Sequence, residues 1–147
     1  MKITIIEQQF DPWEMLSAYQ KTHTQYAAKY GATAVFVGTM RDLNEDQSIS
    51  DMFLEHYPGM TEKYLEKMSQ QAITKYQLMD SLIIHRVGHI SPDETIVLVA
   101  VWSAHRKQAF EACRELMEEL KSKAPFWKKE TLKSGKQHWV EHNTKGY

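Results

Sequence analysis

The chain has 147 residues, of which 42% are hydrophobic and 25% are charged, and its formal net charge at pH 7 is -1. This length and composition predict a single globular domain over residues 1–147, and the balanced charge argues against a general binder of nucleic acids or membranes. The only cysteine, Cys113, leaves no intramolecular disulfide. The longest apolar run, residues 96–102, is too short to span a bilayer, and no signal peptide begins the chain. We therefore expect a cytoplasmic protein.

Hydrophobic periodicity divides the chain into strands and three main helices. The first helix begins at Asp11-Pro12, because aspartate caps free N–H groups and proline suits the first helical turn. The predicted helices run over residues 11–21, 61–76 and about 105–123, and a further short helix is left open over residues 23–30. The predicted strands cover residues 2–8, 32–41, 49–57, 80–90, 94–103, 126–132 and 137–142.

This order of elements predicts an α+β fold with a mostly antiparallel sheet. The strands over residues 80–90 and 94–103 are separated by a turn and predict a hairpin, as do the last two strands. The strand over residues 32–41 is expected to end at Gly38 and to deliver Arg41 to a rim. Residues 42–47 are polar, and we expect them to form a mobile connection.

Two kinds of reactive site are not favoured by the pattern. Cys113 lies in the middle of a helix on its apolar stripe, which favours a buried structural thiol over a nucleophile. His85 and His89, like His138 and His142, are four residues apart on predicted strands. Such pairs share a face but lie about 13 Å apart, too far to bind one metal ion. We therefore expect no metal and no cofactor.

The strongest chemical signal is a concentration of cations where the last helix ends. Residues 121–136 contain six lysines and one glutamate, which predicts a pocket for a small anion. A Pro-Phe-Trp segment lies between Lys121 and Lys128. Apolar surroundings and a second nearby cation both lower the pKa of a lysine. A lysine with a lowered pKa can act as a base or nucleophile near neutral pH.

Further basic residues join this candidate set. His105 and Arg106 stand at a predicted helix start, where free backbone N–H groups attract anions. Lys128 and Lys129 face opposite ways on a strand, so only one enters a pocket, and periodicity does not select which. Taken singly, such lysines are better explained as partners of a helix dipole or as guards of an edge strand. Together with Arg41 they favour a binding site.

Several segments resemble the large, catalytic subunits of molybdopterin synthase, the MoaE family, in register over residues 31–141. They are Phe36-Val37-Gly38-Thr39-Met40-Arg41, residues 54–60, residues 84–88, Ser103-Ala104-His105-Arg106 and residues 121–130. The resemblance implies an α/β hammerhead fold with an additional antiparallel sheet. It also implies a homodimer at the centre of a heterotetramer, with a small ubiquitin-like sulfur-carrier subunit at each end.

The activity implied by the resemblance is sulfur transfer in molybdenum cofactor biosynthesis. The carrier's C-terminal Gly-Gly thiocarboxylate enters the pocket and gives its sulfur to cyclic pyranopterin monophosphate (precursor Z), forming the dithiolene of molybdopterin. A sulfurtransferase with imported sulfur needs no catalytic cysteine, and a phosphorylated substrate suits a cluster of cations. The alternative is a non-catalytic docking module for the extended tail of a small carrier protein, since the strand after Pro125 offers an edge for pairing.

The resemblance assigns roles position by position. It implies that Lys121 and Lys128 are catalytic, and so it selects Lys128 over Lys129 as the inward lysine. The substrate-binding positions that it implies are Phe36, Thr39, Met40, Arg41, His105, Arg106, Lys129 and Glu130. The chain departs from the family at Thr39, where lysine is common. It departs again after residue 141, where His142-Asn143 replaces an arginine that reaches the neighbouring subunit, with Lys145 as a candidate substitute.

Overall fold

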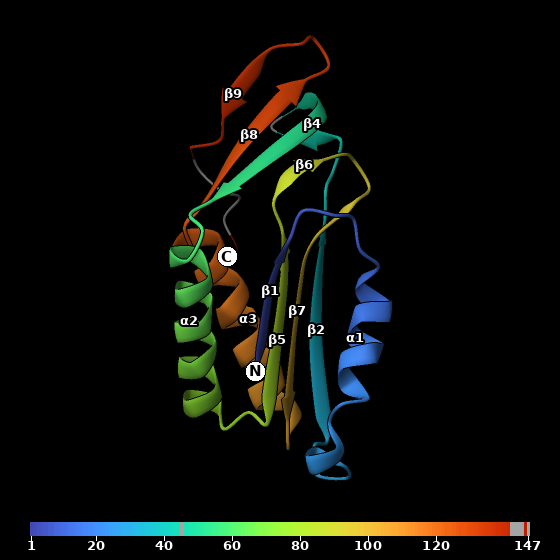
Figure 1. The fold of residues 1–147 in the computed structure, drawn as a ribbon, viewed down its shortest axis with the longest axis vertical. Coiled ribbons are helices and arrows are strands. Elements are labelled where there is room, and N and C mark those ends of the chain that lie inside the picture. Colours follow the sequence, from blue (N-terminus) through green and yellow to red (C-terminus); the bar gives the residue numbers. More distant parts are fainter. Residues whose placement is uncertain (45, 142–145, 147) are drawn as a thin grey trace.

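The computed structural model describes residues 1–44, 46–141 and 146. The described part holds two sheets with helices packed on one of them (Figure 1). The elements in chain order are β1 (Lys2–Ile6), α1 (Pro12–Gln20), the 3-10 helix η1 (Thr24–Tyr26), β2 (Ala32–Thr39), β3 (Leu43–Asn44), β4 (Gln47–His56), α2 (Met60–Tyr76), β5 (Asp80–Arg86), β6 (Gly88–Ile90), β7 (Thr95–Ser103), α3 (Arg106–Ser122), β8 (Phe126–Leu132) and β9 (Gln137–Trp139). The predicted mixed fold with mostly antiparallel pairing is confirmed.

The first sheet has the strand order β1-β5-β7-β2 and is covered on both faces. Helices α2 and α3 lie on one face and α1 on the other (Figure 1). Ile83 and Val99 pack toward α2 and α3, whereas Leu98 and Trp102 pack with residues of α1. Both faces of β5 and β7 are therefore buried, which explains why these strands are nearly continuous runs of apolar side chains.

The second sheet lies beyond one end of the first along the long axis of the molecule (Figure 1). Its order is β3-β4-β8-β9, and β6 also pairs with β4. A separate apolar core that includes Ile49, Met52 and Ile90 fills the space beneath it. The last helix, α3, runs from the first sheet toward the second, so its C-terminal residues lie near both.

One predicted strand is in fact two. Residues 80–90 are expected to form one strand, but β5 ends at Arg86 and β6 begins at Gly88 in the other sheet. Gly88 has φ +81°, a backbone conformation that glycine adopts without steric cost and that lets the chain change direction. The prediction that His85 and His89 share a strand face is therefore wrong. The β5–β7 hairpin itself is confirmed.

Smaller differences concern short elements. The polar connection over residues 42–47, which was expected to be mobile, contains the short strand β3, which pairs with the start of β4. The short helix left open over residues 23–30 exists as η1. The last strand, β9, ends at Trp139, three residues before its predicted end. Nothing in the described part of the chain forms a helix long and apolar enough to cross a membrane.

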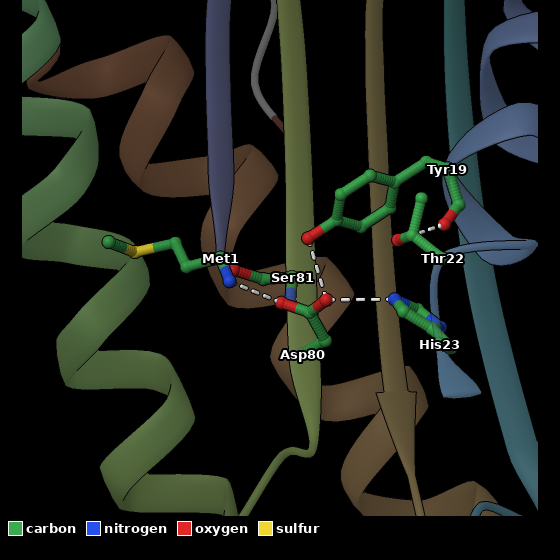
Figure 2. A network of polar contacts seen from close by, with 6 residues as sticks. All are labelled: Met1, Tyr19, Thr22, His23, Asp80 and Ser81. Atoms are coloured by element: carbon green, nitrogen blue, oxygen red, sulfur yellow. Dashed lines mark hydrogen bonds and ion pairs between the residues drawn. The ribbon is translucent and has the colours of Figure 1, made fainter. Parts of the chain in front are cut away.

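A buried carboxylate, Asp80, joins β5 to β1 and α1 (Figure 2). Its Oδ2 accepts hydrogen bonds from the Tyr19 hydroxyl at 2.6 Å and from His23 Nε2 at 2.8 Å. Its Oδ1 accepts from the Ser81 amide at 2.8 Å and pairs with the Met1 amino group at 2.5 Å. Burial raises the pKa of the Asp80 carboxyl, but the hydrogen bonds from the Met1 amino group, the Tyr19 hydroxyl and the Ser81 amide, with the charge of the amino group, outweigh burial and hold the pKa below its usual value.

Replacing Asp80 with asparagine is expected to lower the free energy of unfolding at pH 7 by about 2–3 kcal/mol. A carboxylate whose pKa is lowered by folding stabilises the protein above its unfolded pKa of about 3.9, and this contribution is lost as the pH falls through the folded value. The gap between wild type and Asp80→Asn in urea unfolding should therefore narrow below about pH 4. Asp51→Asn is the control, because Asp51 pairs with the exposed His89. It should cost less than about 0.5 kcal/mol.

Candidate functional site

Lys121 and Lys128 are placed by the end of α3 and the start of β8. The apolar face of α3, with Cys113, Leu116 and Leu120, packs on the first sheet and fixes the rotation of the helix. The helix ends before Pro125, which cannot extend it, and Lys121 lies in its last turn. Lys128 lies opposite Leu54 in the antiparallel pairing of β8 with β4. Both lysines therefore lie where the two sheets meet.

Two cavities of different size share these two lysines. The larger, of about 580 Å³, is bounded by β2 and α3 and includes Phe36 and Cys113 in its lining. The smaller, of about 60 Å³, is bounded by β4, β5 and β8 and includes His85 and Trp127. Lys121 and Lys128 line both cavities, so any group that enters one cavity meets the same pair of amines as a group that enters the other.

The surroundings of the two lysines lower their pKa values. Protein around the Lys121 amine removes part of its hydration, and the charge of Lys128 adds to this, so its pKa falls to about 8 although the residue remains accessible to solvent. The pKa of Lys128 is lowered mainly by burial. The charge of Glu130 opposes that shift, and the charge of Arg41 reinforces it. Arg41 therefore lies within electrostatic reach of Lys128.

Glu130 is a buried counter-charge two residues beyond Lys128. Glu130 is 4% exposed. Its Oε1 accepts a hydrogen bond from Asn44 Nδ2 at 2.8 Å, and its Oε2 lies 3.5 Å from His138 Nε2. These contacts connect β8 to β3 and β9. The geometry supports a role in holding the strand that carries Lys128, alongside the substrate contact implied by the resemblance.

Of the predicted positions that the structure describes, only Phe36, Lys121 and Lys128 line either of the two cavities. Thr39, Met40 and Lys129 have quite different surroundings. Met40 is 6% exposed and belongs to the core under the second sheet. Thr39, at the end of β2, lines a separate shallow cavity on the α1 side. The Lys129 amine lies over the rings of Phe53 and Trp139, at 5.9 and 5.5 Å from their centroids. Lys129 thus occupies the face of β8 opposite to Lys128.

His105 and Arg106 lie at the other end of α3 from Lys121. Both are exposed, and His105 is the N-cap residue of the helix. Fifteen residues separate Arg106 from Lys121, which corresponds to about 23 Å along a helix that rises about 1.5 Å per residue. One copy of the chain therefore does not bring these residues to the lysines. Asn143 and Lys145, the candidates for a cross-subunit contact, lie outside the described residues, as does His142.

His85 is a residue of the smaller cavity that the sequence interpretation did not assign to the site. It is 4% exposed, its Nδ1 donates to the Arg86 carbonyl at 2.7 Å, and its ring stacks on Phe126 with centroids 4.0 Å apart. Burial is the main cause that lowers its pKa to about 4, and the charges of Lys121, His56 and Lys128 lower it further. The available signal was one histidine among the apolar residues of a buried strand.

The thiol of Cys113 fits the sequence interpretation of a buried structural residue. Cys113 is buried, and burial raises the pKa of its thiol to about 11, so the thiol stays protonated at neutral pH. Among the residues that the structure describes, no three His, Cys, Asp or Glu side chains gather in a group that could bind a metal ion. The groups with perturbed pKa values that line both cavities are the amines of Lys121 and Lys128.

Comparisons of the sequence and the fold with known proteins show the family of this chain. Residues 5–123 match the family model described as "MoaE protein". The chain is 47% identical over 139 residues to the molybdopterin synthase catalytic subunit of Ralstonia nicotianae, covering 95% of this chain and 76% of that protein. Its structure is similar to the molybdopterin biosynthesis MoaE protein from Burkholderia ambifaria, with TM-score 0.79, 42% identity and coverage of 99% and 92%.

A second structural comparison concerns a complex. The fold is similar to a chain in a protein–protein complex of subunits 1 and 2 of the molybdopterin-converting factor from Helicobacter pylori. The TM-score is 0.78 and the identity 26%, with coverage of 97% of this chain and 92% of that chain.

Proposed function

This chain belongs to the MoaE protein family, and we propose on that basis that it is the catalytic subunit of a molybdopterin synthase. It transfers sulfur from the C-terminal thiocarboxylate of a small ubiquitin-like carrier subunit to cyclic pyranopterin monophosphate, forming the dithiolene of molybdopterin. The observation that carries this proposal is the position of Lys121 and Lys128 between two cavities of unequal size. Such an arrangement brings two reactants of different shape to one pair of amines.

The two cavities suit the two reactants. A volume of about 580 Å³ is in the range of small-molecule sites and accommodates a pterin with its cyclic phosphate. The smaller cavity, of about 60 Å³, accommodates a narrow group, and a tail that ends in two glycines has no side chains to exclude. The proposal therefore places the pterin against β2 and α3 and the carrier tail against β4 and β8.

The chemistry follows from the charges at the junction. Ammonium groups attract both the thiocarboxylate and the phosphate, and they stabilise negative charge that develops when the thiocarboxylate is attacked or the cyclic phosphate opens. An amine with a pKa of about 8, such as Lys121, is partly unprotonated near neutral pH and can transfer a proton or form a transient covalent bond. Sulfur arrives on the carrier, so the reaction as proposed needs no resident cofactor. We also propose that the protein acts in the cytoplasm.

The test of this function is product formation. The protein is incubated with thiocarboxylated carrier and cyclic pyranopterin monophosphate, and the dithiolene is detected by mass spectrometry after alkylation. The proposal expects product that depends on all three components. Tight binding of the carrier with no product at any concentration would instead support the docking-module alternative.

We further propose that the working unit contains two copies of this chain. His105 and Arg106 lie about 23 Å from Lys121 along α3, so they reach a lysine cavity only if it belongs to another copy. This proposal predicts complementation between two inactive variants. A mixture of Lys121→Ala and His105→Ala copies, dissociated and reassembled together, should recover about a quarter of wild-type activity, because random pairing makes half the dimers mixed and each has one intact site.

The control mixes Lys121→Ala with Lys128→Ala copies. Lys121 and Lys128 line the same cavities of one copy, so each copy in this mixture lacks one lysine of its pair. Mixed dimers then contain no complete site, and the mixture should stay as inactive as either variant alone. The decisive comparison is thus Lys121→Ala with His105→Ala at equal protein concentration. If that mixture stays as inactive as either variant alone, His105 does not serve a neighbouring copy.

A further inference from the structure

His85 is held in one orientation in the wall of the smaller cavity. Its Nδ1 donates to the Arg86 carbonyl at 2.7 Å, so that nitrogen carries the proton of the neutral ring. One face of the ring stacks on Phe126 with an interplanar angle of 15°. These two contacts fix both the rotation and the tautomer of the ring. Its second nitrogen, Nε2, is therefore a hydrogen-bond acceptor.

The side chains that line this cavity include few hydrogen-bond acceptors. Apart from His85, the side chains that line it are apolar or donate N–H groups, as Trp127 and the protonated forms of Lys121 and Lys128 do. With both lysines protonated, His85 supplies the only nitrogen or oxygen acceptor among these described lining side chains. A peptide in the cavity would satisfy its carboxyl end with the lysines, but its amide N–H groups would lose water and need an acceptor.

We propose that His85 is a positioning residue whose Nε2 accepts a hydrogen bond from a backbone amide of the carrier tail, so that the thiocarboxylate is directed toward Lys121 and Lys128. The inference rests on the proposed function and adds a residue to it. The ring suits this role because it stays uncharged at neutral pH, chiefly through burial. A charged ring would have no acceptor and would repel the two lysines.

The first test removes the acceptor from the protein. His85→Phe retains the stack on Phe126 but has no Nε2, and we expect about a tenfold rise in the KM for thiocarboxylated carrier with the KM for the pterin unchanged. His85→Gln, which offers an amide oxygen, should recover part of the loss. His56→Gln is the matched control, since His56 lies opposite Phe126 on β4 and should leave both KM values near wild type. Thermal unfolding verifies that each variant is folded.

The second test removes the donor from the carrier. A semisynthetic carrier in which one of the two terminal amides is replaced by an ester lacks that N–H but keeps its shape. At one of the two positions the ester should raise the wild-type KM about tenfold and leave that of His85→Phe unchanged. A merely structural role of His85 would not produce this coupling. If His85→Phe fails to fold, the KM values of the wild type for the ester and amide carriers can still be compared.

Two results overturn the inference. One is a wild-type enzyme that uses both ester carriers as well as the amide carrier, and the other is a His85→Phe variant whose KM for carrier is unchanged. Failure of the proposed function is recognised separately, because the wild type would then form no dithiolene with the amide carrier. In that case calorimetric binding of amide and ester carriers still shows whether His85 contacts the tail.

Discussion

Replacing Lys121 with alanine is expected to reduce product formation by about 100-fold or more, since it removes a positioned acid–base group that is shared by both cavities. The rate is measured with saturating loaded carrier and pterin, so that a binding defect does not hide the effect on turnover. Lys121→Arg separates two roles of the amine. Arginine retains the positive charge but does not lose its proton near neutral pH, so substrate binding should survive while turnover falls.

Lys123→Ala is the matched control for this prediction. Lys123 lies at the same end of α3, is exposed and is the C-cap residue, so its replacement removes one lysine charge without touching either cavity. We expect turnover within about twofold of wild type, as for surface substitutions in general. Near-normal turnover in Lys121→Ala would contradict the assignment of Lys121, whereas equal losses in both variants would point to a nonspecific effect of charge.

Replacing Lys128 with alanine is expected to cause a loss of similar size, about 100-fold or more, and also to shift the pH dependence of what remains. The charge of Lys128 lowers the pKa of Lys121. Without that charge, the pKa of Lys121 rises, although burial still keeps it below the usual value for lysine. If the unprotonated amine is the active form, activity in wild type increases as the pH rises through about 8, and in Lys128→Ala the inflection moves to higher pH.

The measurement is the pH profile of residual kcat/KM in Lys128→Ala beside that of wild type. Lys133→Ala serves as control, because Lys133 is exposed in the turn between β8 and β9, and its profile should coincide with that of wild type. An inflection that stays in place in Lys128→Ala would mean that Lys121 is not the titrating group. An inflection that moves to lower pH would contradict the electrostatic coupling of the two amines.

Much of the local structure could be predicted from residue patterns. Helix α3 follows from apolar residues at three- and four-residue spacing and from Pro125, which ends it, and β8 begins and ends where the pattern predicts. The break between β5 and β6 was not predicted, because Val87 and Gly88 are compatible with one continuous strand. The break follows from the pairing of β6 with β4 in the second sheet. The short strand β3 was missed for a related reason, since its two residues have no pattern apart from their pairing with β4.

Some residues of the candidate site could be predicted from the sequence, and others could be identified only from the structure. Lysines at a helix end beside aromatic residues are visible in the sequence, and they indicated Lys121 and one of Lys128 and Lys129. The resemblance selected Lys128. Arg41 was also part of the basic set read from the sequence, and in the structure it lies within electrostatic reach of Lys128. His85 could not be assigned, because a histidine in a buried strand has many uses, and only the packing of β5 beside β8 places it at the cavity with both lysines.

The sequence by itself determined the kinds of groups available for a site, a cluster of amines and a thiol on an apolar helix face, and the order of the three main helices and most of the strands. These depend on residue type and short-range spacing, which are complete in the linear chain. Only the tertiary structure decided that Lys121 and Lys128 stand between a large cavity and a small one, that His85 lines the small one, and that His105 and Arg106 lie at the far end of α3. Those relations depend on distances between segments remote in sequence, which are fixed only when the two sheets pack together.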